Sequence, residues 1–178
     1  MRFTSQEEYG LRCMVQMARH EARGPLTIGD IARTEKLGNA YVGKIMRVLR
    51  QGGMVEAQHG PAGGYRLPRP AVDMNVGEIL AVLGGRLFEA KYCEKFGGEQ
   101  PFCVHTTECS IRSLWSGLDL IVDQILRRTS LAELVRTEHT MSAWIRRQVP
   151  VALEAAARAS IHPGPVGSLI PVRAGRQA

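Results

Sequence analysis

Three cysteines fall within one short stretch of this 178-residue chain, at Cys93, Cys103 and Cys109. Cysteine thiolates bind iron–sulfur clusters and zinc, and they also act as redox switches. Their spacings, with nine and then five intervening residues, match neither the paired C-x-x-C of a zinc ribbon nor a ferredoxin run. Residue types and spacing therefore predict a soft-metal or redox site and support a cluster and zinc equally, with three unrelated thiols as the plain alternative.

A tetrahedral metal site would need a fourth ligand in addition to the three sulfurs. His105, Glu108 and Glu99 are the candidates nearby, and a residue from elsewhere in the chain is also open. Cys13 lies in the middle of an expected helix and is better explained as a small buried side chain. The sequence contains no Ser/His/Asp set, paired-carboxylate motif or nucleotide fingerprint, so we do not expect an enzyme.

Basic residues form the second group with a chemical role, and they concentrate in the first part of the chain. Residues 1–70 hold 11 Lys/Arg against 6 Asp/Glu, whereas residues 71–178 hold 12 against 11. An excess of positive charge in one segment favours a polyanionic partner. We therefore expect nucleic acid to bind through the first 70 residues.

The elements that would position these basic residues can be recognised from caps and periodicity. Ser5–Glu8 has a capping-box pattern, Thr27 and Asn39 are suitable N-caps, and Gly52-Gly53 ends the third helix. We expect helices over 4–22, 27–34 and 39–51, and then a β-hairpin from 54–57 and 65–67 around a glycine-rich loop. This order predicts a mainly α fold, with a winged helix-turn-helix over residues 1–70.

In such a domain the third helix enters the major groove and the hairpin loop approaches the DNA backbone. An ordinary solvated helix face and a plain glycine turn are the alternatives. A nucleotide-binding loop is excluded because Pro68 and Pro70 stand where its helix should begin. The predicted DNA contacts are Asn39, Ala40, Tyr41, Lys44, Arg47 and Arg50 on the helix, and His59, Gly60, Pro61, Gly63, Gly64 and Tyr65 in the wing.

The second part of the chain is expected to form a short helix, a cysteine-containing loop and two further helices. Asn75 caps the short helix, residues 71–110 contain the loop with one short strand at 87–90, and Ser110 opens a long helix. Ser130 caps one more helix through about Arg147. Residues 149–178 are expected to form a mobile C-terminal tail, which has no periodicity from about residue 159 onward. The long helix has an apolar stripe too long for the first domain to cover, so residues 111–148 are expected to pair with a second copy.

Membrane insertion and export are not expected from this sequence. No apolar run approaches the roughly 20 residues that a membrane helix needs, and Glu7 and Glu8 stand where a signal peptide would have its apolar stretch. We therefore expect a soluble, cytoplasmic protein without a membrane partner.

Over about residues 1–140 the sequence resembles the IscR/NsrR/RirA-type bacterial transcription regulators. The matching motifs combine the start of the chain, the wing, the three cysteines and the flanking helices. They are Met1-Arg2-Phe3-Thr4-Ser5, Tyr9-Gly10-Leu11-Arg12, Ile31-Ala32, Tyr41-Val42, Gly60-Pro61-Ala62-Gly63-Gly64-Tyr65, Val76-Gly77-Glu78-Ile79, Leu114-Trp115 and Ser130-Leu131-Ala132-Glu133-Leu134.

The resemblance implies a homodimer with two winged-helix heads, a long dimerisation helix and an iron–sulfur cluster bound by Cys93, Cys103 and Cys109. The state of the cluster would then set affinity for a double-stranded DNA operator at promoters for cluster assembly, iron or nitrosative-stress genes. The resemblance favours a cluster over zinc. A thiol-redox or zinc-containing regulator of the same fold remains the alternative.

The sequence departs from the family pattern at three places. Some members use a histidine three residues after the last cysteine as fourth ligand, but this chain has Arg112 there. Others use an acidic residue of the first helix from across the dimer, and the matching position here is Glu8, with His105 in reserve. A longer gap between Cys93 and Cys103 leaves 2Fe–2S and 4Fe–4S both open, and Gly43 replaces an acidic residue that some relatives carry in the third helix.

Overall fold

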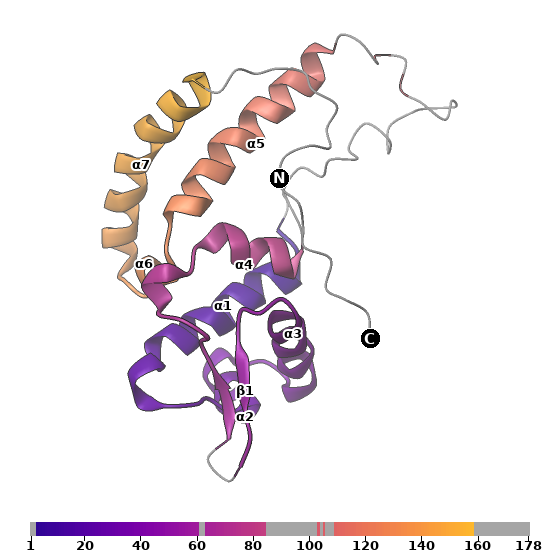
Figure 1. Ribbon diagram of the computed structural model, residues 1–178, viewed down its shortest axis with the longest axis vertical. Helices are drawn as coiled ribbons and strands as arrows, with labels where there is room; N and C mark the ends of the chain where they lie inside the picture. The colour runs from indigo at the N-terminus through magenta and orange to yellow at the C-terminus, as the bar shows by residue number, and fades with distance from the viewer. Residues whose placement is uncertain (1–2, 61–62, 85–102, 104, 106–108, 159–178) are drawn as a thin grey trace.

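The computed structural model describes residues 3–60, 63–84, 103, 105 and 109–158, which form a winged-helix unit and a pair of long helices (Figure 1). The elements run in the order α1 (Ser5–Arg19), η1 (Glu21–Arg23), α2 (Ile28–Glu35), α3 (Asn39–Gln51), β1 (Glu56–Gln58), β2 (Gly64–Arg66), η2 (Ala71–Asp73), α4 (Val76–Leu83), α5 (Ser110–Arg128), α6 (Leu131–Leu134) and α7 (Glu138–Arg158). The mainly α class and the winged helix-turn-helix are confirmed.

The wing is an antiparallel hairpin that is tied to the helices through its second strand. β1 pairs with β2 in a register that places Ala57 opposite Tyr65. On its other edge Tyr65 exchanges two backbone hydrogen bonds with Leu26, at 2.8 and 2.9 Å. The segment between η1 and α2 thus acts as a third, very short strand, and it fixes the hairpin against the base of α2.

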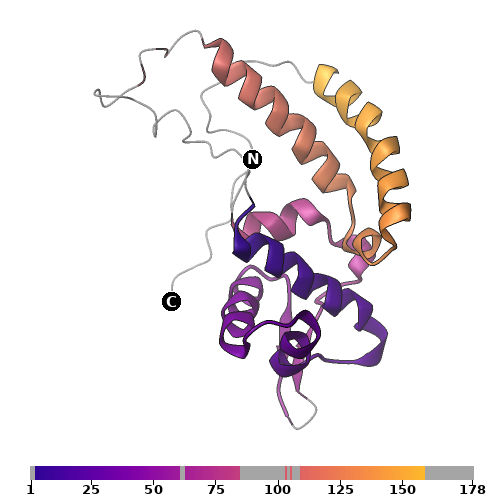
Figure 2. The ribbon, with the colours of Figure 1, turned by 180° about the vertical axis from the view of Figure 1, so that it is seen from behind.

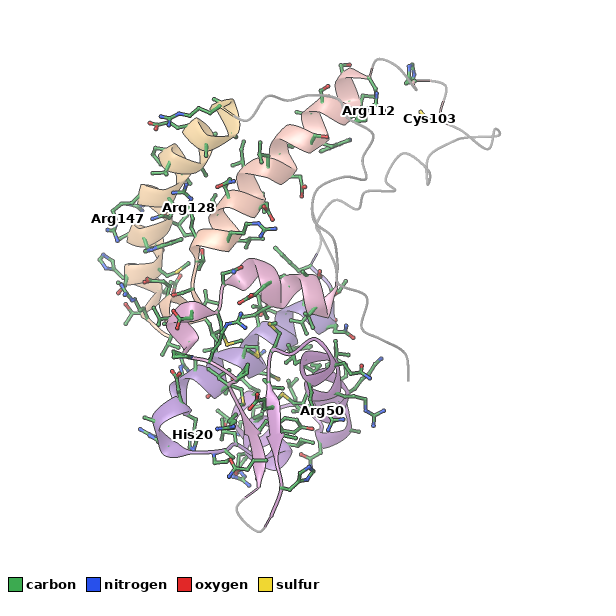
Figure 3. The ribbon with its side chains drawn as sticks, viewed as in Figure 1. His20, Arg50, Cys103, Arg112, Arg128 and Arg147 are labelled. Carbon is green, nitrogen blue, oxygen red and sulfur yellow. The ribbon has the colours of Figure 1, made fainter. Side chains whose placement is uncertain are left out.

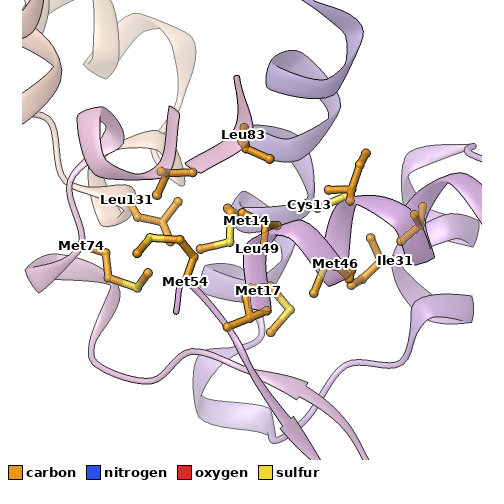
Figure 4. Packing of buried hydrophobic residues seen from close by; sticks show 14 of the residues in the cluster. Cys13, Met14, Met17, Ile31, Met46, Leu49, Met54, Met74, Leu83 and Leu131 are labelled. Atoms are coloured by element: carbon orange, nitrogen blue, oxygen red, sulfur yellow. The ribbon is translucent and has the colours of Figure 1, made fainter. Parts of the chain in front are cut away.

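A methionine-rich core joins the three helices of the winged helix to the second half of the chain (Figure 4). Met14 of α1, Ile31 of α2 and Met46 of α3 are fully buried. Met74 and Leu131, which precede α4 and begin α6, are fully buried in the same cluster. The second half is therefore anchored in the same core that positions α3.

Local capping explains where most helices begin, with two differences from the expected caps. Thr4 caps α1 in a capping box with Glu7, one residue before the expected box at Ser5. Gly38 precedes α3 without a side-chain cap, so Asn39 is the first helical residue and not the N-cap. Asn75 caps α4 as expected, and its side chain accepts the N–H of Glu78.

The cap of α2 is complete and gives a first testable prediction. Thr27 Oγ1 accepts the N–H of Asp30 at 3.1 Å and donates to Asp30 Oδ2 at 2.6 Å. We expect Thr27→Ala to lower the free energy of unfolding by about 1 kcal/mol, measured by urea denaturation. Thr34→Ala on the same helix is the control, because its hydroxyl only donates back to the carbonyl of Asp30 and should matter little. Equal losses in the two variants would contradict the role of the cap.

The pH dependence of this cap follows from the same hydrogen bonds. Thr27 holds the pKa of Asp30 below its ordinary value of 3.8 by donating from its side chain and its backbone, and Arg33 adds to the effect. A carboxyl with a lowered pKa stabilises the fold above its unfolded pKa and loses that contribution as the pH falls through its folded pKa. The contribution of the cap is therefore expected to be complete at neutral pH and to disappear only in strong acid.

Beyond α5, the expected single helix after Ser130 is in fact two helices. Ser130 caps α6, which ends after one turn, and the Thr137 hydroxyl accepts the N–H of Thr140 at the start of α7. α7 then continues past Arg147 and through Pro150 to Arg158. The expectation that the helix ends near Arg147 and that a tail begins at residue 149 is therefore wrong, because residues 149–158 belong to α7. The residues from 159 onward and the expected strand at 87–90 lie outside the described residues.

α7 lies along α5, and the two helices extend away from the winged helix (Figure 2). Trp144, Ala152 and Ala156 of α7 are buried, but α5 has no buried residue. Ile111, Leu114 and Leu118 remain 59%, 57% and 41% exposed. The first half of the expected apolar stripe is thus uncovered within one copy. None of the helices in the described part of the chain has both the length and the apolar composition needed to cross a membrane.

Candidate nucleic-acid interface and cysteine site

α3 separates an apolar face, which packs into the core, from an exposed face with basic and polar side chains. Val42, Ile45, Met46 and Leu49 are buried, and no acidic residue occurs between Asn39 and Gln51. No carboxylate in the described part of the chain forms an ion pair with Lys44, Arg47 or Arg50, the last of which is labelled in Figure 3. The exposed residues of α3 are Asn39, Ala40, Lys44, Arg47 and Arg50, which the sequence assigned to DNA contact, and Gln51, which it did not.

Tyr41 differs from its neighbours on α3, because its ring is half-buried against α1. It packs edge-on against the ring of Tyr9, with 5.9 Å between the ring centroids. The guanidinium of Arg12 lies 5.4 Å from the centroid of the same Tyr9 ring, a cation–π arrangement. Tyr41 therefore positions the first turn of α3 against α1, a role that sequence reasoning missed.

A partly buried ion pair fixes α1 to the end of α2. Arg12 Nε donates to Glu35 Oε2 at 2.6 Å, Arg12 Nη2 donates to the Glu35 carbonyl at 3.0 Å, and the Gln16 amide donates to the other carboxylate oxygen. These contacts raise the pKa of Arg12, first through the hydrogen bond to Glu35 and then through the nearby charges of Glu35 and Glu8. Because Glu35 ends α2, the pair sets the angle at which the helix-turn-helix leaves α1.

The glycines of the wing loop allow its backbone to pack closely against neighbouring backbone atoms. His59 and Gly60 are exposed, and Gly60 has a positive φ of 109° that favours glycine. A Cβ on Gly63 would lie 2.5 Å from the Gln58 carbonyl oxygen, and one on Gly64 would lie 2.6 Å from that of Leu26. Backbone packing therefore explains Gly63 and Gly64, while Pro61 lies outside the described residues.

Two other wing residues, Tyr65 and Arg66, are engaged in contacts within the protein and are therefore less free to contact DNA. The backbone of Tyr65 is bound to Leu26, and its side chain is half-buried. Arg66, the next residue of β2, pairs with Glu56 at 3.0 Å across the hairpin. Among the described residues of the wing loop, His59 and Gly60 are exposed, and the Gly60 carbonyl accepts the N–H of Gly63 at 2.9 Å.

The cysteine site begins where α5 begins. Cys103 and Cys109 are free thiols of intermediate exposure, and Cys109 is the N-cap of α5, with its Sγ accepting the N–H of Arg112 at 3.4 Å. The sequence pointed to this sulfur as a ligand but gave no sign that it caps the helix. Cys93 lies outside the described residues, and within the described ranges no three His, Cys, Asp or Glu side chains converge as a metal site would require.

Glu7 and Glu8 have different environments although they are adjacent on α1. Glu7 is buried and its carboxylate is occupied by the backbone and hydroxyl of Thr4, at 2.6 and 2.8 Å. Glu8 is exposed, and its charge acts on Arg12 one turn later. The reserve ligand His105 is exposed as well. Of the two acids in the first turn of α1, Glu8 is thus the one whose carboxylate is free to act as a metal ligand.

A comparison with known families decides the class of the protein. The model of the family Rrf2, described as "Iron-dependent Transcriptional regulator", matches residues 3–137. The chain belongs to the Rrf2 family. The Rrf2-family proteins are transcriptional regulators, so this chain is a regulator and not an enzyme.

Named relatives agree with this family. The chain is 26% identical to the HTH-type transcriptional regulator IscR of Vibrio vulnificus (strain YJ016), covering 94% of this chain and 97% of the relative. It is 31% identical to Protein rrf2 of Nitratidesulfovibrio vulgaris, covering 76% of this chain and 88% of the relative.

Solved structures of Rrf2-like regulators show the same fold. The structure of T. potens IscR matches with a TM-score of 0.62 and 25% identity over 76% of this chain and 86% of that chain. The structure of CymR, the global cysteine regulator of B. subtilis, matches with a TM-score of 0.62 and 26% identity over 76% of this chain and 96% of that chain.

Proposed function

We propose that this Rrf2-family regulator is a homodimer whose affinity for a DNA operator is set by an iron–sulfur cluster. The observation that carries the DNA-binding part is the exposed face of α3, which is basic, free of acidic residues and next to the wing. The cysteines at the start of α5 support the cluster part, together with the similarity to IscR.

The roles of the α3 side chains follow from their chemistry and their place along the helix. Asn39, Ala40 and Lys44 lie on the N-terminal half, where a recognition helix contacts base edges. Arg47 and Arg50 lie further along, where guanidinium groups contact phosphates. His59 and the glycines of the wing approach the backbone beside the groove.

Dimerisation through α5 follows from its uncovered apolar side chains. Ile111, Leu114 and Leu118 occupy one side of the first half of α5, and α7 leaves them exposed. A second copy of α5 would bury them, as expected for an isologous contact between two identical faces. The two α3 helices would then read half-sites about 34 Å apart, or a multiple of that distance.

The residues that would hold the cluster are Cys93, Cys103 and Cys109, with Glu8 of the partner subunit as fourth ligand. The donor set fits: the two described cysteines are unpaired, and Cys109 Sγ already accepts a backbone N–H, as cluster-bound sulfurs commonly do. In one copy Cys103 lies near the start of α5, far along that helix from the winged helix (Figure 3), which favours an acidic ligand from a second copy. When bound, the cluster would supply iron that responds to oxidants and nitric oxide.

The link from the cysteines to DNA affinity would run through α5 and α1. Cys109 caps α5, so a change at its sulfur alters the first turn of the dimerisation helix. Glu8 shares α1 with Tyr9 and Arg12, which contact Tyr41 of α3 and Glu35 of α2. Movement of either helix would change the distance or orientation between the two α3 helices of the dimer.

Anaerobic purification tests the cluster directly. We expect a brown dimer with visible absorbance and with iron and sulfide in stoichiometric amounts. Size-exclusion chromatography with light scattering measures the oligomeric state in the same sample. A colourless, iron-free protein after reconstitution would overturn the cluster and leave a thiol or zinc regulator, and a monomer would overturn the role of α5.

Lys44→Ala tests the DNA interface on its own. We expect about 5- to 150-fold weaker binding to duplexes selected from a random pool, measured by fluorescence anisotropy, because one base-edge contact is worth about 1–3 kcal/mol. Arg128→Ala removes an exposed cation at the end of α5 and serves as the control, with affinity close to that of the parent. Equal affinities for all three proteins would contradict the base-edge contact assigned to Lys44.

A further inference from the structure

A basic hollow lies on the winged helix at the end of α1, apart from the residues assigned above to DNA or to the cysteine site. It has a volume of about 690 Å³ and is formed by the last turn of α1, by η1 and by the outer side of α2. Such a volume is in the range of small-molecule sites. Its charged lining consists of Arg19, Arg23, Asp30 and Arg33, to which Gln16, His20 and Thr34 add polar groups.

The positive charges of this hollow are only partly compensated. Arg33 pairs with Asp30 at 3.1 Å, whereas Arg19 and Arg23 form no ion pair with a carboxylate of the described residues. Asp30 also belongs to the cap of α2 and is held there by Thr27. Three guanidinium groups thus face one carboxylate, which leaves two positive charges on the lining.

The nearby carboxylates of Glu21 and Glu35 do not line the hollow and are held by groups outside it or at its edge. Glu35, close to the lining residue Gln16, is bound by Arg12 and by the Gln16 amide. Glu21 of η1 accepts the backbone N–H of Ala71 at 3.1 Å. The hollow therefore attracts anions, and its guanidinium groups can bind oxyanions in bidentate fashion.

We propose that this hollow binds a phosphate group, held by Arg19 and Arg23 from the α1–η1 side and by Arg33 from α2. A bound phosphate would connect the end of α1 to the outer side of α2, the helix that precedes α3. The group could belong to a small phosphorylated molecule or to the DNA backbone. His20, at the hollow, and Arg50, on α3, lie on different sides of the winged helix (Figure 3), which favours the small molecule.

Isothermal titration with pyrophosphate and with inorganic phosphate tests the proposal. We expect the parent to bind pyrophosphate and the double variant Arg19→Gln/Arg23→Gln to bind it at least tenfold more weakly. The control is Arg128→Gln/Arg147→Gln, which removes the same charge from exposed positions of α5 and α7 and should bind like the parent. Circular dichroism and urea denaturation establish that all three proteins are equally folded.

A salt series of DNA affinities identifies the source of the phosphate. Each lost phosphate contact lowers the slope of log affinity against log salt by about 0.9. A slope reduced in the Arg19→Gln/Arg23→Gln variant but not in the control would assign the hollow to the DNA backbone. Weaker pyrophosphate binding with an unchanged slope would assign it to a small molecule. If the two double variants behave alike in both experiments, the hollow binds no phosphate, whether or not α3 binds DNA.

Discussion

Replacing Cys103 by alanine is expected to abolish iron binding and the visible absorbance that goes with it. Three sulfurs and one further ligand leave no spare donor, so loss of one thiolate removes the cluster. Cys103 lies outside every helix and strand, and the fold should therefore survive, as circular dichroism can establish. We expect DNA affinity to differ from that of the cluster-loaded parent and to become insensitive to oxidant.

Cys13→Ala is the matched control for this experiment. Cys13 is completely buried in α1, and burial raises the pKa of its thiol to about 12, which keeps it protonated and unsuited to bind a metal. We expect this variant to retain iron, sulfide and the response to oxidant, and to lose about 1–2 kcal/mol of stability. A Cys103→Ala protein that binds DNA and responds to oxidant like the parent would overturn the proposed switch.

The substitution Gly10→Val is expected to lower the free energy of unfolding by about 3 kcal/mol, measured by urea denaturation. A Cβ at this position of α1 would lie 2.5 Å from both terminal methyl carbons of Leu83. Leu83 is 2% exposed at the end of α4, so its side chain has little room to move aside. The close packing of α1 on α4 therefore requires that residue 10 has no side chain.

Gly38→Val provides the comparison at a glycine with free space around it. Gly38 precedes α3 with φ −70° and ψ 138°, a conformation that valine adopts readily. No atom lies within 4 Å of a Cβ built there. We expect a loss of at most about 1 kcal/mol, from the weaker helix cap. Equal losses at the two positions would mean that Gly10 is not packed as described.

Elements specified by neighbouring residues could be predicted, as the caps of α2 and α4 show. Thr27 with Asp30 and Asn75 with Glu78 are capping pairs within four residues, and both helices begin where the sequence places them. At α1 the sequence contains two overlapping boxes, Thr4 with Glu7 and Ser5 with Glu8. Burial of Glu7 beside Gly84 selects the first box, and this long-range contact has no local signature.

The contacts that position the candidate interface were not predictable for the same reason. Arg12 and Glu35 are 23 residues apart, and the bridge from Leu26 to Tyr65 spans the whole helix-turn-helix. Periodicity reports which face of a helix is buried, but not which polar groups meet across two helices. The residues of α3 were identifiable because their exposure follows directly from the helical period.

The junction at the base of α5 gives that helix the geometry of a lever. The Val76 N–H binds the Thr129 carbonyl at 2.8 Å, the Leu131 N–H binds the Met74 carbonyl at 2.7 Å, and Leu131 is buried in the winged-helix core. From this fulcrum the 19 residues of α5 extend about 28 Å to Cys109 at 1.5 Å per residue. A rotation of about 10° at the junction would move the cysteine end by about 5 Å, so a shift too small to disturb the core is amplified along the arm.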